Sequence, residues 1–418
     1  MPRNVFYAQS GGVTAVINAS AAGVIETARA NRARIGRVYA GHDGILGALA
    51  EDLIDTSGER ASAIVGLTHT PGGAFGSARY KLKGLAEHRA HYERLIDVFR
   101  AHDIGYFLYN GGNDSADTCL KVAQLARELG YPLTCVHIPK TIDNDLAGTD
   151  CCPGFGSVAK YVATSMREAA FDVASMARTS TSVFVLEVMG RHAGWITAAV
   201  GLAEDEEHPI PLLLLLPEVR FDEPRFLAAV ARLVKMHGYC CIGVSEGLRG
   251  ADGGFLSESG LHDSFGHAQL GGAGELIAKL TRDRLGLKYH CALADYLQRS
   301  ARHIASRTDL EQAYAVGRAG VLAALAGQNA VMVSIVRTAD QPYRWTLSHT
   351  PLARVAGRER MVPRSFIRRD GFGITARART YLQPLIEGEA PPPFRRGLPR
   401  FTRLANRRVP RKLAAYSL

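Results

Sequence analysis

The feature that most constrains the fold is a series of short apolar runs that do not alternate between apolar and polar residues. They lie at 4–9, 37–41, 106–110, 134–139, 182–190, 211–217, 240–247 and 330–337. A strand that is covered by helices on both faces reads as a continuous apolar run, whereas a half-exposed strand alternates. We therefore predict mostly parallel strands that are covered on both faces.

Helical patterns separate these runs. The clearest one, at 115–129, ends at Gly130 and is followed by Pro132, which cannot continue a helix. Strands that alternate with helices form right-handed, doubly wound α/β folds, and ligands bind there in the loops after the strands. Because the runs fall into two groups on either side of about residue 150, we predict two Rossmann-like lobes with the active site in the cleft between them.

Composition excludes several classes of protein. With 47% hydrophobic and 22% charged residues the chain reads as globular, and its longest aliphatic run, at 212–216, is too short to cross a bilayer. The seven cysteines form no CxxC pattern, so we expect reduced thiols in a cytoplasmic protein. The net charge is +10, with much of the excess at 395–412, but no RNA-binding motif or zinc-finger spacing accompanies it. We expect neither a nucleic-acid nor a membrane partner.

Two Gly-Gly turns follow predicted strands, at 11–12 and at 111–112. Glycine lets the backbone approach a ligand closely, and the N–H groups of the following helix can hold an anion. The alternative is that these glycines only permit close packing of strand and helix. Neither turn has the spacing of a Walker loop or of the dinucleotide fingerprint, which favours an extended polyphosphate as the ligand.

The segment PKTIDND, at 139–145, carries two carboxylates beside a lysine. One carboxylate, Asp143 or Asp145, can take a proton from an attacking hydroxyl, and the other can hold Mg²⁺ or orient a bound hydroxyl. Lys140 is a point charge suited to a phosphoryl group in transfer. The alternative is an Asx-type turn with a solvated face.

Polar residues also gather near later strands. In MGRHAGW, at 189–195, Arg191 can clamp a phosphate or carboxylate, and we interpret His192 as a packing or capping residue. Glu246 can accept hydrogen bonds from sugar hydroxyls. Tyr296 and Arg299 lie three residues apart, on one face of a predicted helix.

Together these segments resemble the phosphofructokinase family, and specifically its pyrophosphate-dependent branch. The matching stretches are SGGVTAVIN, GGAFGSAR, GGNDS, PKTIDND, EVMGRHAGW, SEG and YLQR, in the family's order and over about residues 4–300. The resemblance implies that 1–150 with about 297–345 form a phosphoryl-donor lobe and that 151–296 form a sugar-phosphate lobe. We expect 346–418 to be a basic extension that packs on the lobes or forms a subunit contact.

The resemblance implies a magnesium-dependent transferase of glycolysis and gluconeogenesis. It would move a phosphoryl group reversibly from pyrophosphate to the 1-hydroxyl of fructose 6-phosphate, giving fructose 1,6-bisphosphate. The resemblance also implies a homodimer or homotetramer.

The resemblance assigns roles by position. Asp143 is the expected general base, with Lys140, Asp114 and Thr141 as the other expected catalytic residues. The expected donor-binding residues are Gly12, Arg79, Gly112 and Ser115. The expected sugar-phosphate contacts are Thr141, Asp143, Asp145, Met189, Gly190, Arg191, Glu246, Tyr296 and Arg299.

Two positions indicate the donor. ATP-using members carry glycine where this chain has Asp114 and Lys140, and the pair found here is similar to the signature of the pyrophosphate users. A carboxylate in the space of the α-phosphate fills volume and repels a nucleotide, while Lys140 adds positive charge beside the transferred group.

Three departures accompany the resemblance. The expected metal ligands are Asn113 and Asp145, but the family has Asp at the position of Asn113, so this side chain can offer only a neutral carbonyl. The positions of two substrate-phosphate arginines fall at Ser182 and near Lys288 or His290. The alternatives that remain are an ATP-dependent sugar-phosphate kinase and a non-catalytic, sugar-phosphate-binding regulatory subunit. A nicotinamide dehydrogenase is disfavoured, because no GxGxxG follows a strand.

Overall fold

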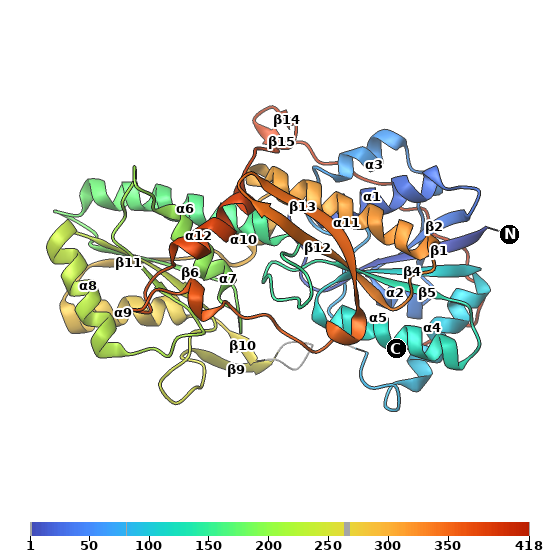
Figure 1. The fold of residues 1–418 in the computed structure, drawn as a ribbon, viewed down its shortest axis with the longest axis horizontal. Coiled ribbons are helices and arrows are strands. Elements are labelled where there is room, and N and C mark those ends of the chain that lie inside the picture. The colour runs from blue at the N-terminus through green and yellow to red at the C-terminus, as the bar shows by residue number, and fades with distance from the viewer. Residues whose placement is uncertain (1, 81, 263–267, 418) are drawn as a thin grey trace.

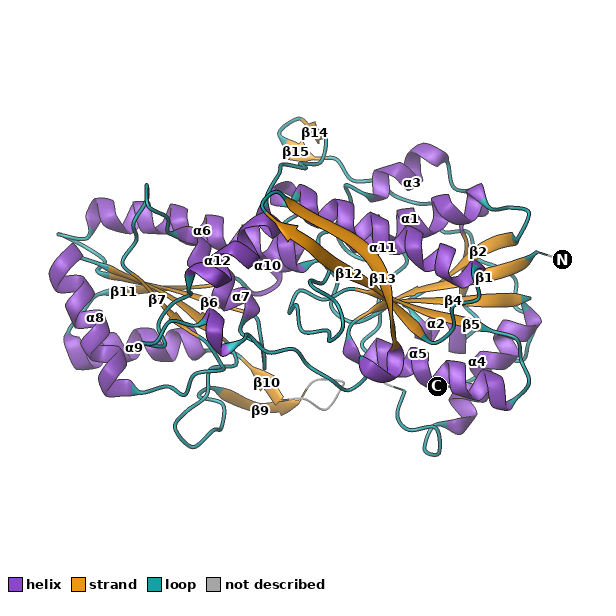
Figure 2. Cartoon of the chain, in the orientation of Figure 1, coloured by secondary structure: helices purple, strands orange, loops and turns teal. Residues whose placement is uncertain are grey.

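The computed structural model describes residues 2–80, 82–262 and 268–417, and it consists of two α/β lobes side by side (Figure 1). Each lobe is built around its own sheet, with helices on both faces (Figure 2). The predicted fold class is thereby confirmed, since both sheets are mainly parallel.

The sheet of the first lobe has the order β13-β12-β5-β4-β1-β2-β3. Its strands are β1 (Arg3–Gln9), β2 (Ile35–Gly41), β3 (Leu53–Asp55), β4 (Ile104–Gly111), β5 (Thr134–Pro139), β12 (Val331–Asp340) and β13 (Tyr343–Pro351). The central pairs are parallel, while β3 and β13 run antiparallel to their neighbours at the two edges.

The sheet of the second lobe has the order β11-β6-β8-β7, and its three pairs are all parallel. Its strands are β6 (Val183–Val188), β7 (Leu212–Leu215), β8 (Cys240–Ser245) and β11 (Tyr289–Leu293). Two small hairpins lie outside the sheets, formed by β9 (Glu258–His262) with β10 (Ala268–Leu270) and by β14 (Phe394–Arg395) with β15 (Leu398–Pro399).

Helices cover both faces of each sheet. They are α1 (Ile17–Ala30), α2 (Ile45–Leu49), α3 (Ala61–Leu67), α4 (Arg89–Ala101), α5 (Asn113–Glu128), α6 (Phe155–Met176), α7 (Trp195–Val200), α8 (Glu223–His237), α9 (Ala273–Leu285), α10 (Asp295–Ser300), α11 (Arg307–Leu325) and α12 (Ala376–Leu382). Short 3-10 helices occupy Thr56–Gly58, Gly201–Ala203, Arg302–Ile304, Leu352–Arg354, Arg364–Phe366 and Gln383–Ile386.

The strand β1 shows why its sequence is continuously apolar. Val5 and Tyr7 point into the core shared with α1, whereas Phe6 and Ala8 point into the core shared with α4 and α5. In Figure 1, α1 and α11 lie on one face of this sheet and α4 and α5 on the other. Each residue of the strand therefore removes apolar surface from water, at about 25 cal/mol per Å² buried.

The first lobe extends further along the chain than predicted. β13 continues the first sheet to Pro351, past the boundary expected at about residue 345. It is an edge strand whose side chains are half-buried or exposed, so it lacks the apolar run that identified the central strands. The edge strand β11 was missed for the same reason.

The C-terminal segment, residues 352–417, contacts both lobes. The N–H of Leu214 donates to the carbonyl of Phe372 at 3.0 Å, and the N–H of Val409 donates to the carbonyl of Leu53 at 2.8 Å. The segment follows a long path over the molecule rather than forming a third globular unit (Figure 1).

The cysteines and the helices bear on two predictions, reduced thiols and the lack of a segment that crosses a bilayer. All seven cysteines carry free thiols, and all except Cys291 are buried, as expected of small apolar core residues. Within the described ranges, no helix combines the length and the apolar character needed to span a bilayer.

Candidate active site

The loops after β1, β4 and β5 meet at the carboxyl edge of the first sheet. The Ser115 hydroxyl, from the first turn of α5, donates to the Ser10 hydroxyl at 2.8 Å. The N–H of Lys140 donates to the carbonyl of Gly111 at 3.0 Å. Three of the loops singled out in the sequence are therefore connected directly.

Lys140 is buried between these loops, with 4% of its surface exposed. Its ammonium group donates to the carbonyl of Gly12 at 2.8 Å. Burial lowers the pKa of Lys140 to about 8, and the positive charges of Arg299 and Arg79 act in the same direction, while Asp143 and Asp145 oppose them. A buried ammonium group of this kind is suited to an anionic ligand that restores its charge balance.

Two guanidinium groups lie over Gly12. A Cβ atom built on this residue would overlap Arg299 Nη1 and would lie 3.5 Å from Arg79 Nη2. The guanidinium of Arg299 also lies 3.8 Å from the centre of the Tyr296 ring, a cation–π contact that orients it. Lys140, Arg79 and Arg299 together make the surroundings of Gly12 strongly positive.

The loop after β5 turns back on itself at the two aspartates. The N–H of Asp143 donates to the Thr141 hydroxyl at 3.0 Å, a local turn that holds the start of the loop. Between the aspartates, Asn144 adopts a left-handed backbone with φ of 54°. Residues other than glycine rarely adopt this conformation, so the surrounding structure must stabilise it.

The carboxylates of this loop crowd one another. Burial raises the pKa of Asp143, whereas the positive charges of Lys140 and Arg191 lower it. Burial also raises the pKa of Asp145 to about 7, with further contributions from the negative charges of Asp143 and Glu359. A bound cation would favour the ionised form of these two buried carboxylates.

The second lobe contributes the loops after β6 and β8. The N–H of Gly190 donates to the Glu246 carboxylate at 3.1 Å, and the N–H of Met189 donates to the side-chain carbonyl of Gln298 at 3.3 Å. Burial raises the pKa of Glu246 to about 7. Three of the expected sugar-side residues, Met189, Gly190 and Glu246, therefore lie around one turn beside Arg191.

The GGNDS loop begins α5, with Gly112 as its N-cap. Asp114 stands in the first turn of this helix and is half-buried. The helix N-terminus attracts anions, so this carboxylate occupies a position that a phosphate group would otherwise favour.

Asn113, an expected metal ligand, contacts the C-terminal segment through both ends of its side-chain amide. Its amide nitrogen donates to the carbonyl of Arg358 at 2.7 Å, and its side-chain carbonyl accepts from the N–H of Gly357 at 2.7 Å. Both ends of the amide thus hold the C-terminal segment. Its assignment to the metal remains a prediction, with this competing interaction.

The described residues contain no preformed group of three or more His, Cys, Asp or Glu side chains that could hold a metal. Mg²⁺ is usually bound by one or two carboxylates together with substrate phosphates and water, rather than by an all-protein cage. The acidic surroundings of Asp145 fit that pattern.

Sequence reasoning missed the contribution of the C-terminal segment. The Glu359 carboxylate pairs with the His192 ring at 2.9 Å, and the neighbouring Arg360 packs beneath the aspartate loop. No motif in the sequence marks these residues, which stand in the stretch Gly-Arg-Glu-Arg at 357–360. His192, which we interpret from the sequence as a packing or capping residue, stacks its ring on Phe255.

Comparison with known proteins identifies the family. A profile described as Phosphofructokinase matches residues 4–322, which is most of the chain. The chain belongs to the phosphofructokinase family. The segment that holds Asn113 and pairs with His192 lies beyond the part matched by the profile.

Similar proteins extend over the whole chain. A protein of Methylococcus capsulatus named pyrophosphate–fructose 6-phosphate 1-phosphotransferase is 68% identical over 413 residues, covering 99% of this chain and 98% of that one. A protein of the same name from Halomonas elongata is 62% identical, with 99% of each chain covered. The crystal structure of a pyrophosphate-dependent phosphofructokinase from Nitrosospira multiformis is 58% identical, covers 100% of both chains and superposes with a TM-score of 0.93.

Proposed function

We propose that this phosphofructokinase catalyses reversible phosphoryl transfer from pyrophosphate to the 1-hydroxyl of fructose 6-phosphate, giving fructose 1,6-bisphosphate. The observation that carries the proposal is the buried ammonium of Lys140, which lies among Asp143, Arg79 and Arg299 at the edge of the first sheet. Relatives of 62% and 68% identity carry the name of this activity, which supports it.

On the acceptor side, Asp143 is the general base. It takes the proton of the 1-hydroxyl as that oxygen attacks phosphorus. The nearby charges of Lys140 and Arg191 favour its ionised form, which is the form that can accept a proton. Arg191, Glu246 and the loop at 189–190 hold the sugar phosphate in line, so the reaction depends mainly on positioning.

On the donor side, Lys140 and Arg79 neutralise the charge on the transferred and departing phosphates. Arg299, an expected sugar-phosphate contact, also lies over Gly12, so its charge acts on the donor as well. The loops around Gly12 and Gly112 let the backbone approach the donor closely. Preorganised positive groups of this kind need no rearrangement as charge develops, so they stabilise the transition state more than the ground state.

Asp114 selects the shorter donor. A carboxylate in the first turn of α5 repels the α-phosphate of a nucleotide, by about 4 kcal/mol for two unit charges 4 Å apart at an effective dielectric of 20. Pyrophosphate has no third phosphate and no nucleoside, so it does not meet this repulsion. Discrimination then comes from an added repulsive group rather than from better contacts.

Asp145 is the residue that best fits Mg²⁺, because it is a buried carboxylate close to the negative charges of Asp143 and Glu359. When bound, the ion would neutralise pyrophosphate and polarise its oxygens. Thr141 supports the loop from which Asp145 projects.

The proposed reaction can be tested directly by its products. Purified protein with pyrophosphate, fructose 6-phosphate and Mg²⁺ should give one equivalent each of orthophosphate and fructose 1,6-bisphosphate, followed by phosphorus NMR. A panel of other sugar phosphates in parallel identifies the preferred acceptor. Binding of fructose 6-phosphate without any turnover would instead indicate a regulatory subunit.

Activity is expected to fall as the pH rises past about 8. The charged form of Lys140 is the active one, and burial lowers the pKa of this group to about 8 while Asp143 and Asp145 limit the decrease. The profile of kcat/KM for pyrophosphate reports the free enzyme and should lose activity above that pH. In the profile of kcat, activity should be lost only at a higher pH, because bound pyrophosphate stabilises the ammonium form of Lys140. A flat kcat/KM profile to pH 10 would contradict a role for the Lys140 charge.

Replacing Gly12 with Ala is expected to impair catalysis with little effect on stability. The new methyl group would overlap the end of Arg299, a flexible side chain that can move away cheaply. We expect kcat/KM for pyrophosphate to fall by about 10²-fold, as for a misplaced catalytic group, while the melting temperature stays close to that of the wild type. Gly130→Ala is the control for a change in stability alone. A Cβ there would meet nothing within 4 Å, but the positive φ strains any residue other than glycine, so this variant should lose stability and keep its activity.

We also propose a homodimer or homotetramer, in line with the family. Sedimentation velocity at several protein concentrations measures the assembly, and a monomer at all of them would reject it.

A further inference from the structure

The backbone of Asn144 directs the two aspartates of the active-site loop. Because Asn144 lies between Asp143 and Asp145 with φ of 54°, its left-handed conformation sets the path of the chain on both sides. Such a conformation costs about 1 kcal/mol or more in a residue other than glycine and persists only where the surroundings enforce it. The question is which groups enforce it here.

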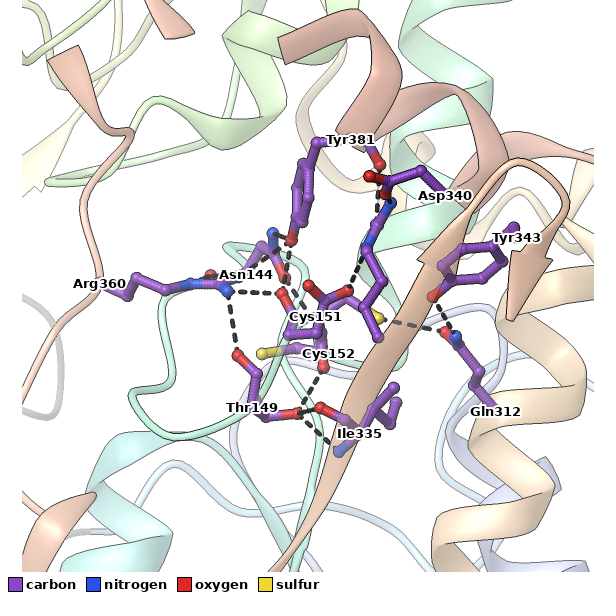
Figure 3. A network of polar contacts seen from close by, with 12 residues as sticks. Asn144, Thr149, Cys151, Cys152, Gln312, Ile335, Asp340, Tyr343, Arg360 and Tyr381 are labelled. Carbon is purple, nitrogen blue, oxygen red and sulfur yellow. Dashed lines mark hydrogen bonds and ion pairs between the residues drawn. The ribbon is translucent and has the colours of Figure 1, made fainter. Parts of the chain in front are cut away.

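The main restraint comes from Arg360, which lies more than 200 residues further along the chain. Its Nη2 and Nε donate to the carbonyl of Asn144 at 2.9 and 3.2 Å. Its Nη1 donates to the carbonyls of Thr149 and Asp150 at 3.0 and 2.5 Å. One planar guanidinium therefore holds three carbonyls of the loop that follows β5. Figure 3 shows Arg360 beside Asn144 and Thr149.

The side chain of Asn144 is held as well. Its amide nitrogen donates to the Tyr381 hydroxyl at 3.0 Å, and its side-chain carbonyl accepts from the N–H of Cys152 at 3.0 Å. The same Tyr381 hydroxyl donates to the carbonyl of Asp150 at 2.5 Å. Arg360 and Tyr381 thus form one network in Figure 3, and both belong to the C-terminal segment.

Arg360 is itself fixed from two sides. Its guanidinium lies 4.7 Å from the centre of the Trp195 ring, which is 2% exposed, and the Trp195 indole donates to the carbonyl of Arg360 at 2.8 Å. The N–H of Arg360 donates to the carbonyl of Asp145 at 2.7 Å. Arg360 therefore has little freedom to move relative to the aspartates.

From these contacts we infer that Arg360 is a positioning residue for phosphoryl transfer, which holds the Asp143–Asp145 loop in its catalytic geometry without touching the substrate. The inference rests on the proposed function, since it assigns Asp143 as the base. It also gives the C-terminal segment, which lies outside the residues matched by the family profile, a part in the active site.

Lysine is a poor substitute at this position. An ammonium group is a compact point charge, whereas the planar fork of arginine presents donors in several fixed directions. A lysine could reach one of the three carbonyls, which would leave the others without their partner and the loop free to relax.

The test compares Arg360→Lys with the wild type and with Arg379→Lys. Arg379 is a matched control, because it lies in the same segment and its guanidinium also holds two carbonyls, those of Glu204 and Gly201, neither of which belongs to the loop after β5. For Arg360→Lys we expect kcat to fall by about 10²-fold, the size of effect that a misplaced catalytic group gives, with the KM of each substrate within about twofold. For Arg379→Lys we expect a kcat within about twofold of the wild-type value, whatever the melting temperature of this variant.

Two further measurements separate positioning from simple stability. Added guanidinium ion at millimolar concentration should restore part of the kcat of Arg360→Ala and none of that of Arg379→Ala. Tyr381→Phe, a small change that keeps the ring, should lower kcat by about tenfold by loosening Asn144. This variant tests the inference even if the arginine variants do not fold.

The outcomes are distinguishable. If Arg360→Lys or Tyr381→Phe keeps the wild-type kcat per folded molecule while the melting temperature falls, Arg360 is only a structural residue and the inference is wrong. If the wild type itself does not use pyrophosphate, the proposed donor is wrong, and the same comparison is then made with ATP, where Asp143 would have the same task.

Discussion

Replacing Asp143 with Asn should lower kcat by about 10³-fold, within the range that a positioned general base supplies. The amide has almost the same shape as the carboxylate but cannot accept the proton of the attacking hydroxyl. The Asp143 carboxylate interacts electrostatically with Lys140 and Arg191, so its negative charge also offsets part of their positive charge. The KM for fructose 6-phosphate should change much less than kcat, since the base acts mainly in the transition state.

The measurement is steady-state kinetics in both directions, with melting temperatures to establish that the variant is folded. Asp117→Asn is a matched control, because Asp117 pairs with Lys121 on α5 and has no part in the proposed mechanism. A kcat for Asp143→Asn within about tenfold of the wild type would mean that another group removes the proton.

Replacing both Asp114 and Lys140 with Gly should remove pyrophosphate turnover almost completely. Loss of a single preorganised charge that stabilises a transition state costs about 10²–10³-fold, and Lys140 is the buried charge nearest Gly12. The two changes restore the glycines found in the ATP-using members, so the repulsion against a nucleotide is removed at the same time.

The single variants divide this effect. Lys140→Gly should account for most of the loss with pyrophosphate, whereas Asp114→Gly should chiefly weaken discrimination against ATP. The assay is kcat/KM for each donor at saturating fructose 6-phosphate. Unchanged pyrophosphate kinetics in the double variant would remove the argument that this pair selects the donor.

Much of the fold could be predicted because central parallel strands must be apolar on both faces. The residues of β1, β4, β5, β6 and β8 satisfy that requirement in the sequence itself. The strand β13 could not be found in this way, since as an edge strand it has side chains that are exposed or half-buried and follows no apolar run.

The candidate site was predictable where short motifs lie on adjacent loops. Lys140, Gly12 and Ser115 are near one another because their strands are neighbours in a sheet. The partners of Asn113 were not predictable, because Gly357 and Arg358 reach it from more than 240 residues away without any periodic signal. For the same reason the sequence did not indicate that Arg360 supports Asn144.

We propose that the chain uses pyrophosphate and excludes ATP at one site. The most direct measurement is the ratio of kcat/KM for pyrophosphate to that for ATP, with fructose 6-phosphate and Mg²⁺ held saturating. We expect a ratio of at least about 10³, the factor that corresponds to roughly 4 kcal/mol of repulsion. A ratio near or below one would contradict it, and would instead favour an ATP-dependent sugar-phosphate kinase.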